Sequence, residues 1–169
     1  MGAVREFEDL ALFAVHLASL EVAVRQEMQR GLKRALVVIE NDAKAQIGHY
    51  QGEVGEFPAW APLADSSEKE KDRIGAPLGA PLLRHGGLYA SFEHEVLAFD
   101  DGVVGSTDPT LIYHEFGTEK MPPRPVLGPA VVKNRERIQQ ILGKAIVQGI
   151  LGGEVVAAGA EYFGGDVTP

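Results

Sequence analysis

Cysteine is absent from the 169-residue sequence, so neither disulfide bonds nor thiolate metal ligands can form. The sequence also has no run of about 18 apolar residues, the length that a membrane-crossing helix needs. Its N-terminus lacks the basic segment followed by an apolar segment that marks a signal peptide. We therefore expect a soluble protein that folds inside the cell and is not exported by the usual route.

Basic residues are fewer than acidic ones, since 16 Lys and Arg stand against 24 Asp and Glu, for a formal net charge of -8. Affinity for nucleic acid comes from clustered Lys and Arg that release counterions from phosphate. The charge argues against a protein that grips DNA, although Lys133, Arg135 and Arg137 could touch DNA or an acidic neighbour. An acidic surface would suit a channel through which DNA slides without sticking.

Motifs for catalysis or cofactor binding are also lacking. The sequence has no phosphate-binding glycine loop, no dinucleotide fingerprint and no zinc-binding His-Glu-x-x-His helix. The best candidate metal cluster is His85, His94 and His114 with nearby glutamates, but alternation along a strand places His94 on the opposite face from Glu93 and Glu95. We expect no metal site and no cofactor.

The serines and paired carboxylates do not suggest an active site either. None of the four candidate nucleophiles lies in an elbow motif; they are Ser66, Ser67, Ser91 and Ser106. Asp100 and Asp101 precede Gly102 in a turn signal, which explains them without catalysis. We therefore predict no catalytic residues and a protein that is not an enzyme.

The length fits one domain, which we place at residues 1–153. Apolar residues recur at helical spacing over 5–48, without proline and with Gly31 as the one interior break. This pattern predicts one long helix or two collinear helices, and the alternative is two helices folded against each other at Gly31.

Glycine and proline punctuate residues 50–83 and predict an extended loop. Inside it, Ser66 and Ser67 indicate the start of a short helix and Gly75 its end. Because loops this long are usually functional, we expect it to contact another subunit.

The remaining chain predicts a small sheet followed by a helix. Residues 88–116 form the sheet region, with a hairpin turn at 100–102 and a short helix or strand over 111–116 that ends at Gly117. The prolines at 121–125 require an extended chain. A helix is expected over 129–151, starting at Pro129 and ending at Gly152, and 154–169 form a C-terminal extension that orders only against a partner.

The predicted fold class is α+β, with a small antiparallel sheet packed against the long N-terminal helix and the C-terminal helix. Four sequence segments are not explained by composition. They read W-x-P-L at 60–63, P-L-L-R-x-G-x-L-x-x-S at 81–91, Y-x-x-F-G-T at 113–118 and M-P-x-R-P-x-L-x-P-A at 121–130.

In this order, the four segments resemble the tail-completion or head-tail joining proteins of long-tailed bacteriophages, a family related to phage virion morphogenesis proteins. The resemblance implies a structural virion protein, made in the cytoplasm of the bacterial host, that forms a ring, as a hexamer, at the neck between capsid and tail. Its partners would be further copies of itself and neighbouring neck, connector or tail-tube proteins, with DNA passing through the ring. A tail terminator that caps the tail tube and a non-viral oligomeric interaction module are the alternatives.

Physical reasoning on the same segments assigns three roles. Trp60 can bury a large apolar surface and attach the long loop to the domain. Gly117 permits a positive φ, after which Thr118 can bond to the local backbone. Arg124 stands on a stiff strut between prolines and would pair either with a neighbouring subunit or within the chain in a salt bridge.

We expect residues 113–125 at a subunit interface, with Glu115 and Arg124 held in fixed positions. The candidate assembly or structural residues are Trp60, Leu63, Leu82, Leu83, Gly87, Leu88, Tyr113, Glu115, Phe116, Gly117, Thr118, Met121, Pro122, Arg124 and Pro125.

Overall fold

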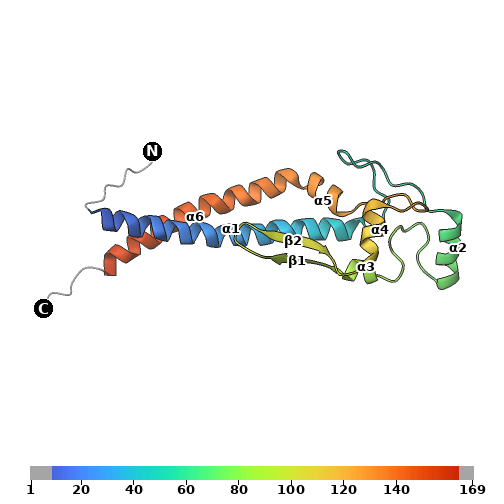
Figure 1. Ribbon diagram of the computed structural model, residues 1–169, viewed down its shortest axis with the longest axis horizontal. Helices are drawn as coiled ribbons and strands as arrows, with labels where there is room; N and C mark the ends of the chain where they lie inside the picture. Colours follow the sequence, from blue (N-terminus) through green and yellow to red (C-terminus); the bar gives the residue numbers. More distant parts are fainter. Residues whose placement is uncertain (1–8, 164–169) are drawn as a thin grey trace.

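The computed structural model describes residues 9–163 and confirms the predicted α+β class. Its elements in chain order are α1 (Leu10–Gln46), α2 (Asp65–Ile74), α3 (Gly87–Ala90), β1 (Phe92–Val96), β2 (Gly102–Ser106), α4 (Thr110–Phe116), α5 (Leu127–Lys133) and α6 (Arg135–Phe163). The molecule is elongated along α1: the hairpin lies on one side of this helix, and α5 with the first part of α6 lies on the other (Figure 1). In the part of the chain described, no helix combines the length and the apolar composition that a membrane crossing requires.

The long N-terminal helix is a single element. It starts at Leu10 because the Asp9 side chain accepts a hydrogen bond from the N–H of Ala11, at 3.0 Å. It continues through Gly31 without interruption, so the alternative of two helices folded at that glycine is wrong. Of the predicted range 5–48, residues 5–8 lie outside the described part of the chain.

Glycine at position 31 serves close packing. A Cβ atom on Gly31 would lie 2.6 Å from the Cβ of Ala145 on α6. Further along α6, a Cβ on Gly149 would lie 2.5 Å from the Cα of Val24 on α1. The small residues therefore let the backbones of α1 and α6 approach more closely than larger side chains would allow.

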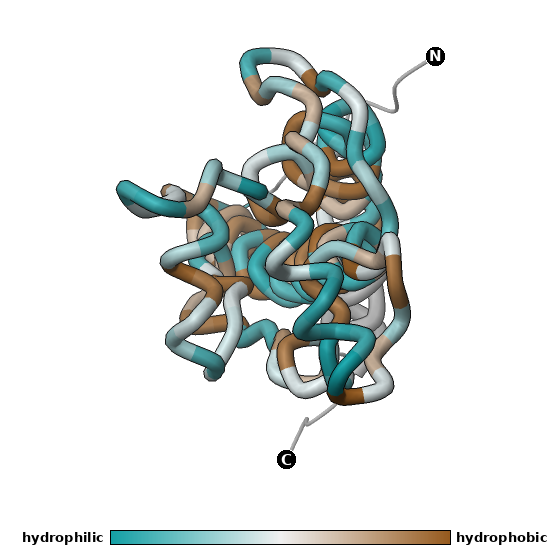
Figure 2. Tube along the Cα trace, turned by 90° about the vertical axis from the view of Figure 1, so that its right-hand side faces the viewer, coloured by the Kyte–Doolittle hydropathy of each residue, from teal (hydrophilic) through white to brown (hydrophobic). Residues whose placement is uncertain are grey.

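The hydrophobic core lies around the C-terminal half of α1. Its buried members are Ile39, Ala43, Ile47, Trp60, Leu88, Phe92, Leu111, Val126 and Ala130. Viewed along the long axis, loops and short helices surround the helices, and hydrophobic positions occur on these outer segments as well as at the centre (Figure 2). The core occupies one end of the molecule, and among the described residues the other end is formed by α1 and α6 (Figure 1).

The sheet is a two-stranded antiparallel hairpin, paired from Phe92 with Ser106 to Val96 with Gly102. His94 points to α1, where its Nδ1 contacts the Glu40 carboxylate, while Glu93 and Glu95 are exposed on the other face. The predicted alternation is thus confirmed. Lys44 first, and His94 second, hold the pKa of the Glu40 carboxyl below its usual value.

The predicted sheet region 88–116 was too long at both ends. Leu88 lies in the helical turn α3, which follows Gly86 and closes through a hydrogen bond from the Ser91 N–H to the Gly87 carbonyl, at 3.0 Å. Residues 110–116 form the helix α4, one of the two possibilities left open. It starts where the Asp108 side chain accepts the N–H of Thr110, at 2.9 Å.

The loop 50–83 contains the predicted short helix, α2, which ends at Gly75 as expected. Lys71 on this helix is buried, and its Nζ donates to the carbonyl oxygens of Pro77, at 2.9 Å, and Ala80, at 2.7 Å, and also to that of Leu83. Burial lowers the pKa of the lysine. The sequence analysis missed this anchor because Lys71 stands in a charged run that is typical of a solvated helix.

Two boundaries of the C-terminal helix were predicted wrongly. The helical region starts at Leu127 instead of Pro129, and it is divided at Asn134 into α5 and α6. α6 continues through Gly152 to Phe163, because a glycine weakens a helix by about 1 kcal/mol but does not end it. Most of the predicted extension 154–169 is therefore helical, and 164–169 lie outside the described residues.

The close approach of α1 and α6 predicts opposite effects for two Gly→Ala changes in α6. Gly149→Ala should lower the free energy of unfolding by about 1 to 3 kcal/mol, because the new methyl group meets the α1 backbone. Gly143→Ala should raise it by up to about 1 kcal/mol, since nothing lies within 4 Å and alanine favours the helix. Urea denaturation followed by circular dichroism measures both values. Equal effects of the two changes would contradict the packing described here.

Candidate assembly surfaces

Arg124 joins three of the four segments and is buried, with 4% of its surface exposed. Its Nη2 donates to the carbonyl oxygens of Ala61, at 3.1 Å, and Pro62, at 3.2 Å. Its backbone N–H donates to the carbonyl oxygen of His114, at 2.6 Å. The sequence analysis expected Arg124 to pair with a neighbouring subunit or in a salt bridge within the chain. Among the described residues, it instead pairs with main-chain carbonyls of its own chain and not with a carboxylate.

Glu115 also acts within the chain. One oxygen of its carboxylate accepts the N–H groups of Val126, at 2.8 Å, and Leu127, at 2.9 Å. These N–H groups stand at the start of α5, where they have no partner within the helix and where negative charge is favourable. The bond explains why the helix begins before Pro129, and it leaves Glu115 occupied instead of displayed at an interface.

The turn between α4 and the proline strut has the predicted geometry. Gly117 has a φ of 72°, and a Cβ there would lie 2.8 Å from the carbonyl oxygen of Met121. The Thr118 N–H donates to that same oxygen at 2.8 Å, and the Thr118 hydroxyl accepts the N–H of Lys120 at 3.3 Å. Glycine is required at position 117 both for its φ and for the space.

Several candidate residues belong to the core or its edge. Trp60 and Leu88 are core members, Leu82 and Leu83 pack against the core, and Pro125 is buried. The predicted role of Trp60 in attaching the loop to the domain is confirmed. Leu63 is partly exposed, and its N–H donates to the hydroxyl of Tyr50 at 3.0 Å.

The remaining candidates lie at the surface. Tyr113 is 56% exposed and Phe116 is 82% exposed, and with Ile112 they form an apolar patch on α4. Gly87, Thr118 and Pro122 are exposed as well, and Met121 is partly exposed. If residues 113–125 contact another protein, they do so through this patch and not through Arg124 or Glu115.

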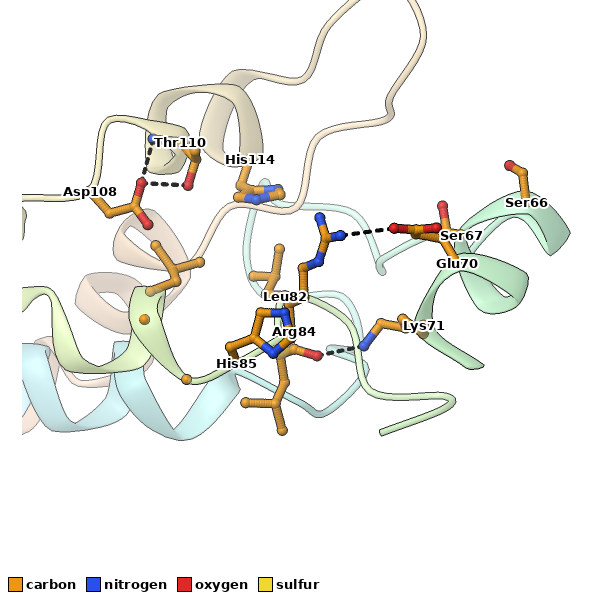
Figure 3. Close-up of a pocket in the computed structure, with 14 residues that line it drawn as sticks. Ser66, Ser67, Glu70, Lys71, Leu82, Arg84, His85, Asp108, Thr110 and His114 are labelled. Atoms are coloured by element: carbon orange, nitrogen blue, oxygen red, sulfur yellow. Dashed lines mark hydrogen bonds and ion pairs between the residues drawn. The ribbon is translucent and has the colours of Figure 1, made fainter. Parts of the chain in front are cut away.

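An open pocket of about 600 Å³ lies between α2, the 82–88 segment and α4 (Figure 3). Its charged groups are partnered: Arg84 binds Glu70 at 2.9 Å, and Asp108 accepts two hydrogen bonds from Thr110. Burial first, and the Arg124 charge second, lower the pKa of His114, so this ring is neutral at pH 7.

The pocket does not assemble a nucleophile with a base. Ser66 and Ser67 lie on its rim, and neither hydrogen bonds to a histidine in the described part of the chain. His85 and His114 line the pocket, whereas His94 faces α1. Among the side chains that the structure describes, those of residues 9–152, no three His, Asp or Glu are arranged to hold a metal ion.

Another apolar surface covers the end of the molecule that, among the described residues, α1 and α6 form (Figure 1). We call residues 10–24 of α1 and 145–152 of α6 the arm. Its exposed apolar side chains are Leu10, Leu12, Phe13, Val15, Leu17, Val22, Ile146, Val147, Ile150 and Leu151. The sequence analysis did not separate these positions from those that face the core, because helical periodicity alone does not tell what covers an apolar face.

Comparisons of the chain with family models, curated proteins and solved structures found no match. The resemblance to phage tail-completion proteins therefore stays a prediction from the four segments.

Because Arg124 is buried and donates to two main-chain carbonyls, its removal should destabilise the fold. Arg124→Ala should lower the free energy of unfolding by about 1.5 to 3 kcal/mol, because the Ala61 and Pro62 carbonyls lose a charged donor. Arg84→Ala is the control, since this exposed arginine contributes only a surface ion pair. Urea denaturation of both variants gives the comparison. A fully stable Arg124→Ala protein would contradict the role of Arg124 in joining these segments.

The lowered pKa of His114 predicts a pH dependence of stability. His114 takes up a proton near pH 6.5 in the unfolded chain but only at lower pH in the folded chain. The contribution of neutral His114 to the free energy of unfolding is therefore fully present above pH 6.5 and is lost as the pH falls below it. His114→Gln should reduce the decrease in unfolding free energy between pH 7.5 and 5.5. Denaturation at both pH values measures the slope, and an unchanged slope in the variant would rule out His114 as its source.

Proposed function

We propose that the protein is a structural subunit of the head-tail junction of a long-tailed bacteriophage, where copies assemble into a ring that joins the tail to the head. The arm carries this proposal. The resemblance of the four segments supplies the virion context, and the arm supplies an apolar surface that the described part of the chain leaves exposed.

The arm exposes apolar side chains on two neighbouring helices, including Leu10, Val15 and Val22 on α1 and Val147 and Leu151 on α6. Contiguous apolar surface on a soluble protein usually marks an interaction site. In the described part of the chain no third element covers this surface (Figure 1), whereas a second helix pair would complete a bundle.

The charges of the arm favour a second copy as its occupant. The chain as a whole carries a net charge of -8. Within the arm, however, Glu21 is the one side chain among Asp, Glu, Lys and Arg, and it is paired with Arg25 at 2.7 Å. Two copies can therefore bring their arms together without the repulsion that their acidic surfaces would otherwise cause.

The second apolar patch, Ile112, Tyr113 and Phe116 on α4, lies away from the arm, near the other end of α1 (Figure 1). We assign it to contact with a neighbouring neck, connector or tail-tube protein. In this proposal the protein is not an enzyme, and DNA passes through the ring without being bound in a sequence-specific way. The acidic composition supports free passage, because like charges weaken contact with phosphate.

Ring formation is tested by light scattering and negative-stain microscopy of the purified protein, alone and with tails that lack it. We expect rings, and addition to tails should restore joining to heads. If the added protein instead stops the growth of tail tubes, it is a terminator. A protein that stays monomeric and binds no virion part would contradict the proposal.

Changes in the arm should prevent assembly without unfolding the subunit. Val15→Asp combined with Val22→Asp should raise the dissociation constant of the subunits by about 100-fold or more, because burying two unpaired carboxylates is costly. Leu78→Asp is the matched control: Leu78 is exposed in the loop, outside the arm. Circular dichroism checks folding, and light scattering measures association. Normal rings from the double variant would rule out the arm as the interface.

A further inference from the structure

A basic groove runs along the face of α1 that adjoins the start of α6. Four exposed cations border it, Arg30, Lys33 and Arg34 from α1 and Arg137 from α6. Val37, Val38 and Ile141 form its apolar floor. Arg30 pairs with Glu27, and the other three cations form no ion pair with the side chains of residues 9–152. On a chain with a net charge of -8, this is a local concentration of unpaired positive charge.

The hairpin presents the complementary surface. Glu93 and Glu95 are exposed on its outer face, and Asp100 and Asp101 are exposed at its turn. Beside them, Leu97 is 54% exposed and Val103 is 49% exposed. None of the four carboxylates forms an ion pair in the described part of the chain. Four carboxylates around two apolar side chains thus match four cations around an apolar floor.

The two surfaces lie on opposite sides of α1. Leu32 and Leu36 face the hairpin, since a Cβ at Gly102 would lie 2.8 Å from Leu36 Cδ1 and 3.4 Å from Leu32 Cδ2. Arg34 stands two residues from each of these leucines, and two residues correspond to about 200° around an α-helix. One molecule therefore cannot close its hairpin onto its own groove.

From this arrangement we infer that the hairpin of one copy docks in the basic groove of the next. Such a contact joins two different surfaces, so it repeats head to tail and closes into a ring when the rotation between copies allows it. Opposite charges around the rim would fix the register of the contact and exclude wrong pairings. The inference rests on the proposed self-assembly and names a second interface in addition to the arm.

Nucleic acid is the competing occupant of a basic groove, but the apolar floor favours protein. Phosphate contacts need cations and do not use three apolar side chains, whereas Leu97 and Val103 offer apolar surface to that floor. The acidic remainder of the chain would also repel DNA from the groove.

Charge reversal tests the contact. The groove variant carries Arg34→Glu and Arg137→Glu, and the hairpin variant carries Glu95→Lys and Asp101→Lys. Each variant alone should associate about 100-fold more weakly than the parent, because like charges then face each other. An equimolar mixture should recover association to within about tenfold, since every hairpin again meets a groove of opposite charge in an alternating ring. Light scattering measures the mass, and native mass spectrometry reads the alternation.

Controls separate this inference from the proposed function. Glu53→Lys with Glu56→Lys changes the net charge as the hairpin variant does, at exposed positions of the loop, and should associate like the parent. If the parent assembles and both reversed variants assemble equally well, the docking is wrong and the proposed self-assembly stands. If the parent stays monomeric and binds no tails, both are wrong. Loss of DNA binding by a groove variant that assembles normally would assign the groove to DNA and overturn the inference.

The absence of cysteine from the sequence allows a second, direct measurement. A Val38→Cys chain mixed with a Leu97→Cys chain should form a disulfide-linked dimer under mild oxidation, because docking brings floor and hairpin together. A Leu78→Cys chain in place of Leu97→Cys should not. Rings of the two mixed chains that yield no cross-link would overturn the inference, even if the charge variants failed to fold.

Discussion

The close crossing of α1 and α6 is the constraint on which the rest of the structure depends. Gly31 faces Ala145, and Gly149 faces Val24, at distances that leave no room for another carbon atom. Because the two helices are held so closely, α1 can extend beyond the core and still be supported by a partner helix. The arm, the groove between the helices and the side of α1 left for the hairpin all follow from this crossing.

At the other end, two charged side chains hold together segments that the small sheet cannot organise. A two-stranded hairpin is too small to hold a domain together. Arg124 binds the carbonyls of the Trp60 segment, and Glu115 binds the first N–H groups of α5. Three of the four segments, at 60–63, 113–118 and 121–130, are thus joined through side-chain bonds to main-chain atoms. These bonds explain why Arg124 and Glu115 occur in the segments without requiring that either residue contact a partner.

Periodicity and turn signals in the sequence predicted the existence of the two long helical regions, the short helix α2, the hairpin and the class of fold, because these depend on local spacing. They failed where a distant residue decides the outcome. The burial of Arg124 depends on carbonyls some sixty positions away, and the start of α5 depends on Glu115. The division between arm and core was also hidden, since an apolar stripe covered by α6 and one left exposed look the same in sequence.

Because α1 is continuous, it also fixes both the distance and the rotation between the core and the arm. Its 37 residues span about 55 Å and connect the core at one end to the arm at the other without a hinge. Each inserted or deleted residue would shift the arm by about 1.5 Å and turn it by about 100° relative to the hairpin. In natural variants of this chain, length changes within α1 should therefore be close to a whole number of turns, for example seven residues for about two turns, so that both ends still meet their neighbours.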